Sequence, residues 1–157
     1  MEKTYLIELL SKLSSKQMRE LSDFVKSPFF NKNESVEKLF EYLRLSHPEF
    51  KPVKIEKELA YKKLFSPAEY NDSFMRMLIF KLTELAEKYL AYTAMINKPA
   101  DENIYLTGSL LELGLDKNAQ RVINQNEKEL GQIKIKEAKY FLKKFELEKL
   151  KHIIYSR

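Results

Sequence analysis

Cysteine and tryptophan are absent from this chain, and glycine occurs only three times, at Gly108, Gly114 and Gly131. The absence of cysteine excludes a disulfide framework and any thiolate metal ligand. The scarcity of glycine leaves little material for tight hairpins, and neither Gly-x-x-x-x-Gly-Lys-[Ser/Thr] nor Gly-x-Gly-x-x-Gly occurs. Nucleotide binding by a P-loop or by the glycine-rich turn of a dinucleotide-binding fold, which these two motifs form, is therefore excluded.

Residues that build catalytic or metal sites are also few. The only histidines are His47 and His152, and no His-Glu-x-x-His spacing occurs, so zinc is not expected. Carboxylates stand among lysines, as in the pair Glu84 and Lys88, which is typical of solvated helix faces. We therefore predict a non-enzymatic protein with no catalytic residues, no metal, no cofactor and no small-molecule substrate.

Long apolar runs are missing as well, because none approaches the roughly 20 residues that a membrane-spanning helix needs. The first residues, Met1 to Tyr5, do not combine a basic segment with a long apolar one, which argues against a secretory signal. Together with the absence of cysteine, this predicts a cytoplasmic protein. The net charge of +5 is spread along the chain among acidic residues.

What the sequence does contain is leucines, aromatics and charged residues at helical spacing, with 44% hydrophobic residues, enough for a core. This composition predicts an all-α fold of about eight helices. We expect helices over residues 5–13, 14–27, 31–47, 55–65, 71–97, 101–113, 116–131 and 134–155. The helix over 55–65 is expected to bury Ile55 and Leu59, with Leu64 and Phe65 as further candidates.

Several helix ends carry capping signals. Ser14 and Gln17 have the spacing of a capping box, and Pro28 stops the helix that they begin. Asn31 or Asn33 is expected to cap the next helix, and Asn71 or Asp72 the fifth. Asp116 is expected to cap the seventh helix. Gly114 is expected to end the sixth, and Gly108 inside it indicates close approach of a neighbouring helix.

The helix over residues 71–97 is predicted to be the central strut of an N-terminal bundle, residues 1–98. Its apolar residues follow spacings of three and four, and they are Met75, Leu78, Leu82, Leu85, Tyr89, Tyr92 and Ile96. Residues 99–157 are predicted to form antiparallel, solenoid-like (TPR-like) helix pairs. The residues expected to be buried in the last helix are Ala138, Phe141, Leu142, Phe145 and Ile153. Because this pattern continues to Tyr155, we expect the chain to be the N-terminal portion of a longer helical protein.

Ser-Pro-Phe-Phe-Asn, residues 27–31, is the most distinctive local motif. The favoured interpretation is structural: proline ends one helix, Phe29 and Phe30 anchor the turn in the core, and an asparagine caps the next helix. The alternative is an exposed aromatic anchor for a partner.

The stretch from Leu21 to Asn33, with this motif at its centre, resembles the signature of an uncharacterised bacterial family of helical proteins. Tyr70-Asn71-Asp72 before a leucine-rich helix is also similar. The resemblance covers about residues 14–95 and implies a longer, mostly helical protein. It implies no activity and supplies no catalytic residues.

By elimination, we predict a protein–protein interaction or scaffold module that accepts a partner helix or another copy of itself. Aromatic side chains are the expected anchors, namely Phe29, Phe30, Tyr61, Tyr92 and Tyr105. The alternative is a nucleic-acid-binding protein with a helix-turn-helix-like segment at about residues 54–97 and a basic terminal helix. Its phosphate contacts would be Lys57, Lys62, Lys63, Arg76, Lys136, Lys139 and Lys143.

Overall fold

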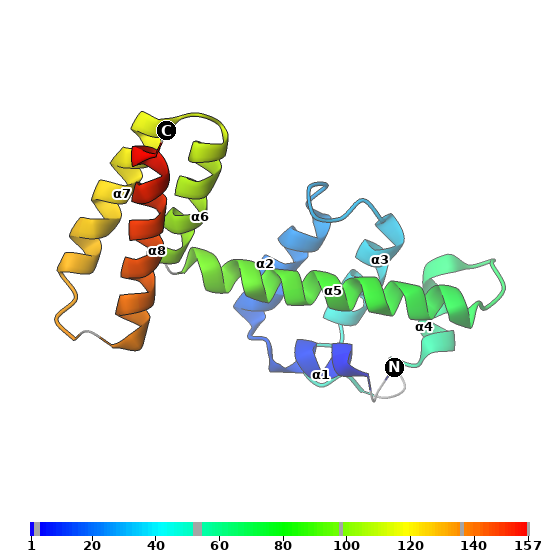
Figure 1. The fold of residues 1–157 in the computed structure, drawn as a ribbon. Coiled ribbons are helices and arrows are strands. Elements are labelled where there is room, and N and C mark those ends of the chain that lie inside the picture. The colour runs from blue at the N-terminus through cyan, green and yellow to red at the C-terminus, as the bar shows by residue number, and fades with distance from the viewer. Residues whose placement is uncertain (2–3, 52–54, 98, 136, 157) are drawn as a thin grey trace. The chain divides into compact units, whose positions relative to one another are not determined.

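The computed structural model describes residues 1, 4–51, 55–97, 99–135 and 137–156, and within these residues it contains eight α-helices and no strand (Figure 1). The predicted all-α fold is confirmed. The helices are α1 (Tyr5–Lys12), α2 (Ser15–Lys26), α3 (Glu34–Arg44), α4 (Lys57–Phe65), α5 (Asp72–Ile96), α6 (Pro99–Glu112), α7 (Asp116–Gly131) and α8 (Ala138–Tyr155).

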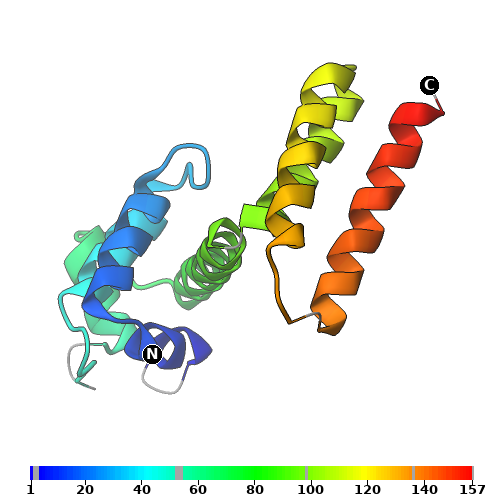
Figure 2. The same ribbon diagram turned by 90° about the vertical axis from the view of Figure 1, so that its left-hand side faces the viewer.

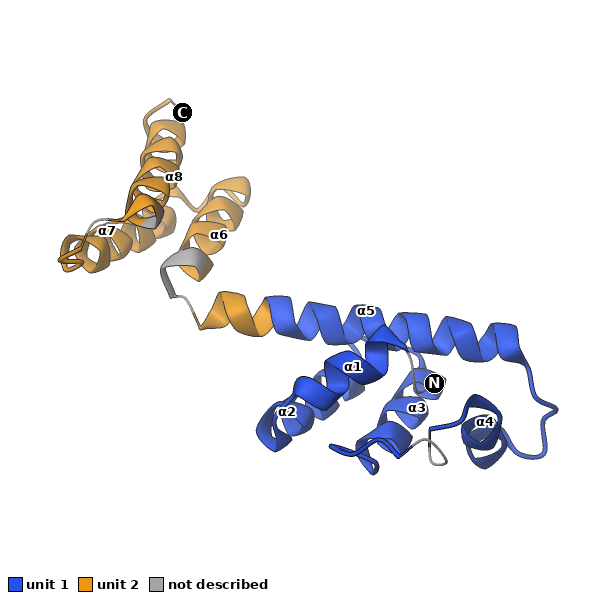
Figure 3. Ribbon diagram, turned by 90° about the horizontal axis from the view of Figure 1, so that it is seen from below, with its two compact units in different colours: residues 1–91 blue, residues 92–157 orange. Residues whose placement is uncertain are grey.

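The chain divides into two compact units, which Figure 3 shows in separate colours. Unit 1 is Met1–Ala91, and unit 2 is Tyr92–Arg157. The division lies inside α5, seven residues before the boundary expected after residue 98. Each unit has its own apolar core cluster.

Local hydrogen bonds set the helix starts in unit 1. Ser14 and Gln17 form the predicted capping box, in which the Gln17 amide donates to Ser14 Oγ at 3.2 Å and the Ser14 amide donates to Gln17 Oε1 at 2.9 Å. Of the two asparagines considered for α3, Asn33 is the cap. At α5 the Phe74 amide donates to Asn71 Oδ1 at 2.9 Å, so Asn71 takes this role.

The core of unit 1 is built from α1–α5, with α5 as its long central helix. The buried α5 residues are Met75, Leu78, Leu82, Leu85, Ala86 and Tyr89. The predicted seam is therefore right up to Tyr89 but wrong at Tyr92 and Ile96, which are exposed. These two residues lie beyond Ala91, where unit 1 ends, so its core does not cover them.

The predicted buried residues of helix α4 are right in part: Leu64 and Phe65 pack, partly buried, against the core of unit 1, but the prediction for Leu59 is wrong. Ala60 and Tyr61 are buried, whereas Leu59 is exposed. Ile55 is buried as expected, but it precedes the helix. The centroids of the Tyr61 and Phe65 rings are 5.0 Å apart. This aromatic contact lies on the side of α4 that packs against the core.

A charged network joins α2 to α3 around Glu41. Ser22 Oγ donates to Glu41 Oε1 at 2.6 Å, Lys26 Nζ lies 3.0 Å from the same oxygen, and Arg44 Nη2 lies 2.7 Å from Oε2. Partial burial alone would raise the pKa of Glu41, but the hydrogen bonds from Ser22, Arg44 and Lys26 outweigh it and lower this pKa to about 2. The network therefore stabilises the ionised carboxylate in the folded chain.

The stability of unit 1 should fall as the pH is lowered from 4.5 toward about 2. A carboxyl group whose pKa is lower in the folded than in the unfolded chain stabilises the fold above the unfolded value, and this contribution is lost as the pH falls through the folded value. The shift corresponds to at most about 3 kcal/mol. Urea unfolding of the wild type and of Glu41→Gln over this pH range measures it. The stability difference between the two proteins should shrink toward low pH, and a difference independent of pH would contradict the assignment.

Unit 2 contains three helices, of which α6 and α8 run in one direction and α7 in the other (Figures 1 and 2). Gly114 ends the helical turn after α6 as predicted, with a φ of 72°. The Leu115 amide donates to the Leu110 carbonyl at 2.8 Å, and the Gly114 amide donates to the Leu111 carbonyl at 3.1 Å. These two bonds are those of a Schellman motif, which needs a positive φ at this position.

The predictions for Gly108 and Asp116 in unit 2 are wrong. A Cβ added at Gly108 would meet no heavy atom of a neighbouring element within 4 Å, so this glycine does not mark a close helix approach. Leu115 rather than Asp116 is the N-cap of α7, and no side chain caps that end. Ile123, Leu130 and Leu147 are buried in one core cluster of unit 2, and Leu111, Ala119 and Val122 are buried as well.

Candidate interaction surfaces

In the loop that joins α2 to α3, the first of two phenylalanines is exposed to solvent and the second packs against α2. Phe29 is 86% exposed, whereas Phe30 is half-buried and its ring stacks on Phe24 with centroids 3.9 Å apart. The edge-to-face contact between Phe29 and Phe30 has a centroid distance of 4.9 Å. The structural interpretation of the Ser-Pro-Phe-Phe-Asn motif is therefore right for Phe30 and wrong for Phe29, because only Phe30 reaches the core.

Hydrogen bonds order this loop although Phe29 is not buried. The Asn31 amide donates to the Ser27 carbonyl at 2.9 Å, and Asn31 Nδ2 donates to the Val25 carbonyl at 2.9 Å. Asn31 Oδ1 accepts from the Asn33 amide at 2.9 Å. The backbone on both sides of Phe29 is thus tied to the end of α2 and the start of α3, so that the exposed ring is presented from an ordered turn.

Behind the loop, an aromatic contact chain leads into the core of unit 1. Phe24 packs edge-to-face against Tyr89 of α5 with centroids 5.9 Å apart. The Tyr89 hydroxyl donates to Glu20 Oε2 at 2.7 Å, and burial together with this carboxylate raises the pKa of Tyr89. Since Phe30 stacks on Phe24, the loop is anchored to both α2 and α5.

A groove of about 680 Å³ lies beside the loop, between the start of α3 and α5. Its walls carry charges of both signs, with lysines at 32, 81 and 88 and glutamates at 34 and 84. The lining residues are Phe30, Asn31, Lys32, Asn33, Glu34, Ser35, Lys81, Glu84, Leu85 and Lys88. Phe29 is not among the lining residues, but its ring contacts Phe30, which is one of them, and we call Phe29 together with this groove the Phe29 surface. It combines an exposed aromatic ring with polar walls, a composition that suits a peptide segment with an apolar anchor.

The other predicted aromatic anchors are placed differently. Tyr61 is only 5% exposed, so its prediction as a partner contact is wrong: its ring packs in the core of unit 1. Tyr92 and Tyr105 are exposed and belong to unit 2. Among the five candidates, Phe29 and Phe30 have rings in direct contact.

Three of the seven basic residues of the nucleic-acid alternative lie beside carboxylates. Lys57 Nζ is 3.5 Å from Asp72, and Arg76 Nε is 2.6 Å from the other oxygen of the same carboxylate. Lys62 Nζ is 2.8 Å from Glu58. Each pairing neutralises a cation that phosphate contacts would require, so this part of unit 1 is a mixed-charge surface.

Of the remaining basic candidates, Lys63 and Lys143 have described side chains. Lys63 lies over the Tyr42 ring, with Nζ 5.8 Å from its centroid. Lys143 is half-buried in α8. Lys136 lies outside the described residues, and Lys139 is described only as part of the α8 backbone.

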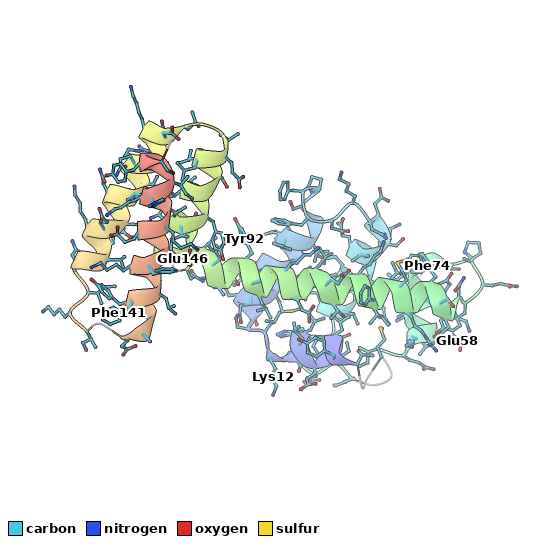
Figure 4. All side chains as sticks on the ribbon, in the orientation of Figure 1. Lys12, Glu58, Phe74, Tyr92, Phe141 and Glu146 are labelled. Carbon is cyan, nitrogen blue, oxygen red and sulfur yellow. The ribbon has the colours of Figure 1, made fainter. Side chains whose placement is uncertain are left out.

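Helix α8 shows the largest difference from the sequence prediction. Phe141, Leu142 and Phe145, which were expected to be buried, are 57%, 65% and 60% exposed. Ala138 and Ile153 are exposed as well. The opposite side of the helix packs inward instead, through Leu147 at 2% exposure. Figure 4 labels Phe141 and Glu146 along this helix.

The sequence does contain a signal for the buried side of α8, which the prediction did not use. Tyr140, Leu147, Leu150 and Ile154 recur at spacings of seven, three and four, and all four belong to the unit 2 core cluster. Helix α8 is therefore apolar on two opposite faces. One face packs in unit 2, and the other is exposed.

The histidines have structural or exposed positions. His47 Nε2 donates to the Leu13 carbonyl at 2.8 Å, which ties the end of α3 to the end of α1. His152 is exposed on α8. Within the described residues, no group of three or more histidine, aspartate or glutamate side chains is arranged to hold a metal ion. No helix in the described part of the chain combines the length and apolar character that crossing a bilayer requires.

The chain was compared with protein-family models, with curated proteins and with solved structures, and none of them matches it. The resemblance to a bacterial family with a Ser-Pro-Phe-Phe-Asn signature therefore stays a prediction.

Proposed function

We propose that this protein is a non-enzymatic interaction module that binds a segment of another protein at the Phe29 surface. The observation that carries the proposal is the exposed Phe29 ring on an ordered loop. An exposed side chain on an ordered turn loses little conformational freedom when a partner covers it, so more of the burial energy is available for binding.

The free energy gained by burying the Phe29 ring is sufficient for a binding anchor. Complete burial of a phenylalanine side chain contributes about 1.5–3 kcal/mol, which is roughly a tenfold to hundredfold change in affinity. Phe30 and Leu85 add apolar surface at the groove, while lysines and glutamates border it. A partner segment with one apolar side chain and polar neighbours of both signs fits this arrangement.

Three groups with shifted pKa values have structural partners, which supports a non-enzymatic role for them. Glu41 ties α2 to α3, and Tyr89 ties α5 to α2. Tyr70 has its pKa raised to about 12 by burial and by its hydrogen bond to Asp72 at the start of α5. A cytoplasmic location is part of the same proposal.

Affinity capture with the full-length protein tests the proposal. Phe29→Ala should lose partners that the wild type captures, because the substitution removes the exposed ring while leaving the Phe30–Phe24 stack in place. Its effect on stability should be within about 0.5 kcal/mol, since the side chain is mostly exposed. Mass spectrometry of the captured proteins, with circular dichroism of each variant, measures both effects.

The matched control is Tyr5→Ala, which removes another exposed aromatic ring of unit 1, on α1 rather than on the loop between α2 and α3. Proteins captured by the wild type and by Tyr5→Ala but lost from Phe29→Ala support the proposal. Identical sets of captured proteins for all three would contradict it.

A further inference from the structure

Helix α7 carries a positively charged face on the side opposite its core residues. It packs against both α6 and α8 (Figures 1 and 2) through a buried stripe that includes Ala119, Ile123, Asn126 and Leu130. Four exposed residues each precede one of these by two positions, and they are Lys117, Arg121, Asn124 and Lys128. Two positions correspond to about 200° around a helix of 3.6 residues per turn, so the two stripes lie on opposite sides. We call these four exposed residues the outer face of α7.

The three cations of the outer face are not neutralised by carboxylates. In the part of the chain that the structure describes, none of them forms an ion pair. Glu127 and Glu129, the sequence neighbours of Lys128, point to the two flanks of the helix, because each is about 100° away from it. Lys151 of α8 binds Glu127, and Gln125 Nε2 donates to Glu129 Oε1 at 3.2 Å. The outer face therefore presents three positive charges and no negative one.

The composition of this face favours duplex DNA over other anionic partners. It has no apolar or aromatic side chain, so it offers neither the anchor that a protein partner needs nor a ring on which the bases of a single strand could stack. Basic and amide side chains on a polar surface are typical of protein–DNA interfaces. A helix fits the major groove of B-form DNA, whereas side chains cannot read the deep, narrow major groove of duplex RNA.

We propose that α7 binds duplex DNA with its outer face in the major groove. Lys117 and Lys128 are separated by about 16 Å along the helix axis, so they contact phosphates on the two walls of a groove about 12 Å wide. Arg121 and Asn124 lie between them and face the base edges, where a guanidinium pairs with guanine and an amide with adenine. Asn124 Oδ1 accepts from Gln120 Nε2 at 2.9 Å, a surface bond that a base contact replaces. This site belongs to unit 2 and does not depend on the Phe29 surface.

Fluorescence anisotropy of a labelled 20-base-pair DNA duplex of mixed sequence, titrated with the full-length protein, tests the proposal. At about 50 mM salt the wild type should bind in the micromolar range or more tightly. Two phosphate contacts predict that the logarithm of the binding constant falls with the logarithm of the salt concentration with a slope of about −2. A wild-type protein that does not bind the duplex at this salt concentration would overturn the proposal.

The triple variant Lys117→Gln/Arg121→Gln/Lys128→Gln should bind the duplex at least about tenfold more weakly, because it removes all three charges of the outer face. Glutamine has nearly the helix propensity of lysine and arginine, and circular dichroism checks that the variant is folded.

The matched control is Lys12→Gln/Lys16→Gln/Arg19→Gln, which removes the same charge from exposed positions of α1 and α2. It should bind the duplex like the wild type. Equal losses in the two triple variants would show that net charge rather than the outer face drives binding, and would overturn the proposal.

Single substitutions test the placement of the side chains in the groove. Lys128→Gln should weaken binding uniformly across duplex sequences and reduce the salt slope by about 1. Arg121→Gln should reduce the differences in affinity between duplexes of different sequence. An Arg121→Gln variant that changes the salt slope alone would overturn the placement of Arg121 at the base edges.

Competition for the labelled duplex identifies the occupant. Unlabelled duplex DNA should displace it at a lower concentration than single-stranded DNA, duplex RNA or polyglutamate. More effective displacement by any of these three would overturn duplex DNA as the ligand. Phe29→Ala should bind the duplex like the wild type even if it no longer captures a protein partner, so failure of one proposal is distinguishable from failure of the other.

Discussion

Replacing Phe40 with alanine should lower the free energy of unfolding of unit 1 by about 3–5 kcal/mol. Phe40 is completely buried and is one of the largest side chains in the core of that unit. Its removal loses the burial of the ring and leaves a cavity that the surrounding helices fill only in part. Urea unfolding followed by circular dichroism measures the loss.

Phe29→Ala is the matched control for this prediction, because it makes the same chemical change at an exposed position. The two variants should differ by at least about 2 kcal/mol. Equal effects would contradict the placement of Phe40 in the core and of Phe29 on the surface. The comparison also separates the role of Phe29 in binding from any role in folding.

Leu147→Ala should destabilise unit 2 by about 2–5 kcal/mol, the second large effect expected in this protein. Leu147 is 2% exposed and belongs to the core cluster of unit 2, so its truncation leaves a cavity in that core. Phe145→Ala, two residues earlier on the exposed face of α8, should change the stability of the monomer by less than about 1 kcal/mol. Thermal unfolding at low protein concentration measures both.

The opposite order, with Phe145→Ala more damaging than Leu147→Ala at low concentration, would contradict the assignment of the two faces.

Features set by neighbouring residues could be predicted from the sequence. The Ser14–Gln17 capping box needs only a serine and a glutamine three residues apart at the start of an apolar run. The Gly114 motif similarly depends on a residue that adopts positive φ at low cost. The number of helices follows from the spacing of apolar residues between such signals.

The choice between two apolar faces of one helix could not be predicted in this way. In α8, Phe141 and Phe145 form one stripe, and Leu147 and Ile154 form another, both at helical spacing. The larger aromatic side chains made the first stripe look like the core. The fold buries the second because that side faces α6 and α7, and this depends on tertiary packing rather than on composition.

Contacts between residues distant in the sequence explain the other differences. Phe29 and Phe30 are equally apolar, but only Phe30 meets Phe24, which is itself packed against α5. Lys57 is predicted as a phosphate contact because it is basic. Its partner in the fold, Asp72, lies 15 positions later in the chain, so the sequence pattern does not reveal the ion pair. Neither outcome follows from local pattern, since each depends on how the helices of unit 1 pack together.

Site-specific photo-cross-linking from position 29 tests the proposed binding surface most directly. The full-length protein would carry a photoreactive phenylalanine analogue in place of Phe29 and, in a parallel sample, in place of Tyr5, and both would be irradiated in living cells. Position 29 should give a discrete cross-linked protein that position 5 does not give. The absence of any adduct specific to position 29, with the protein folded and expressed, would contradict the assignment of this surface to partner binding.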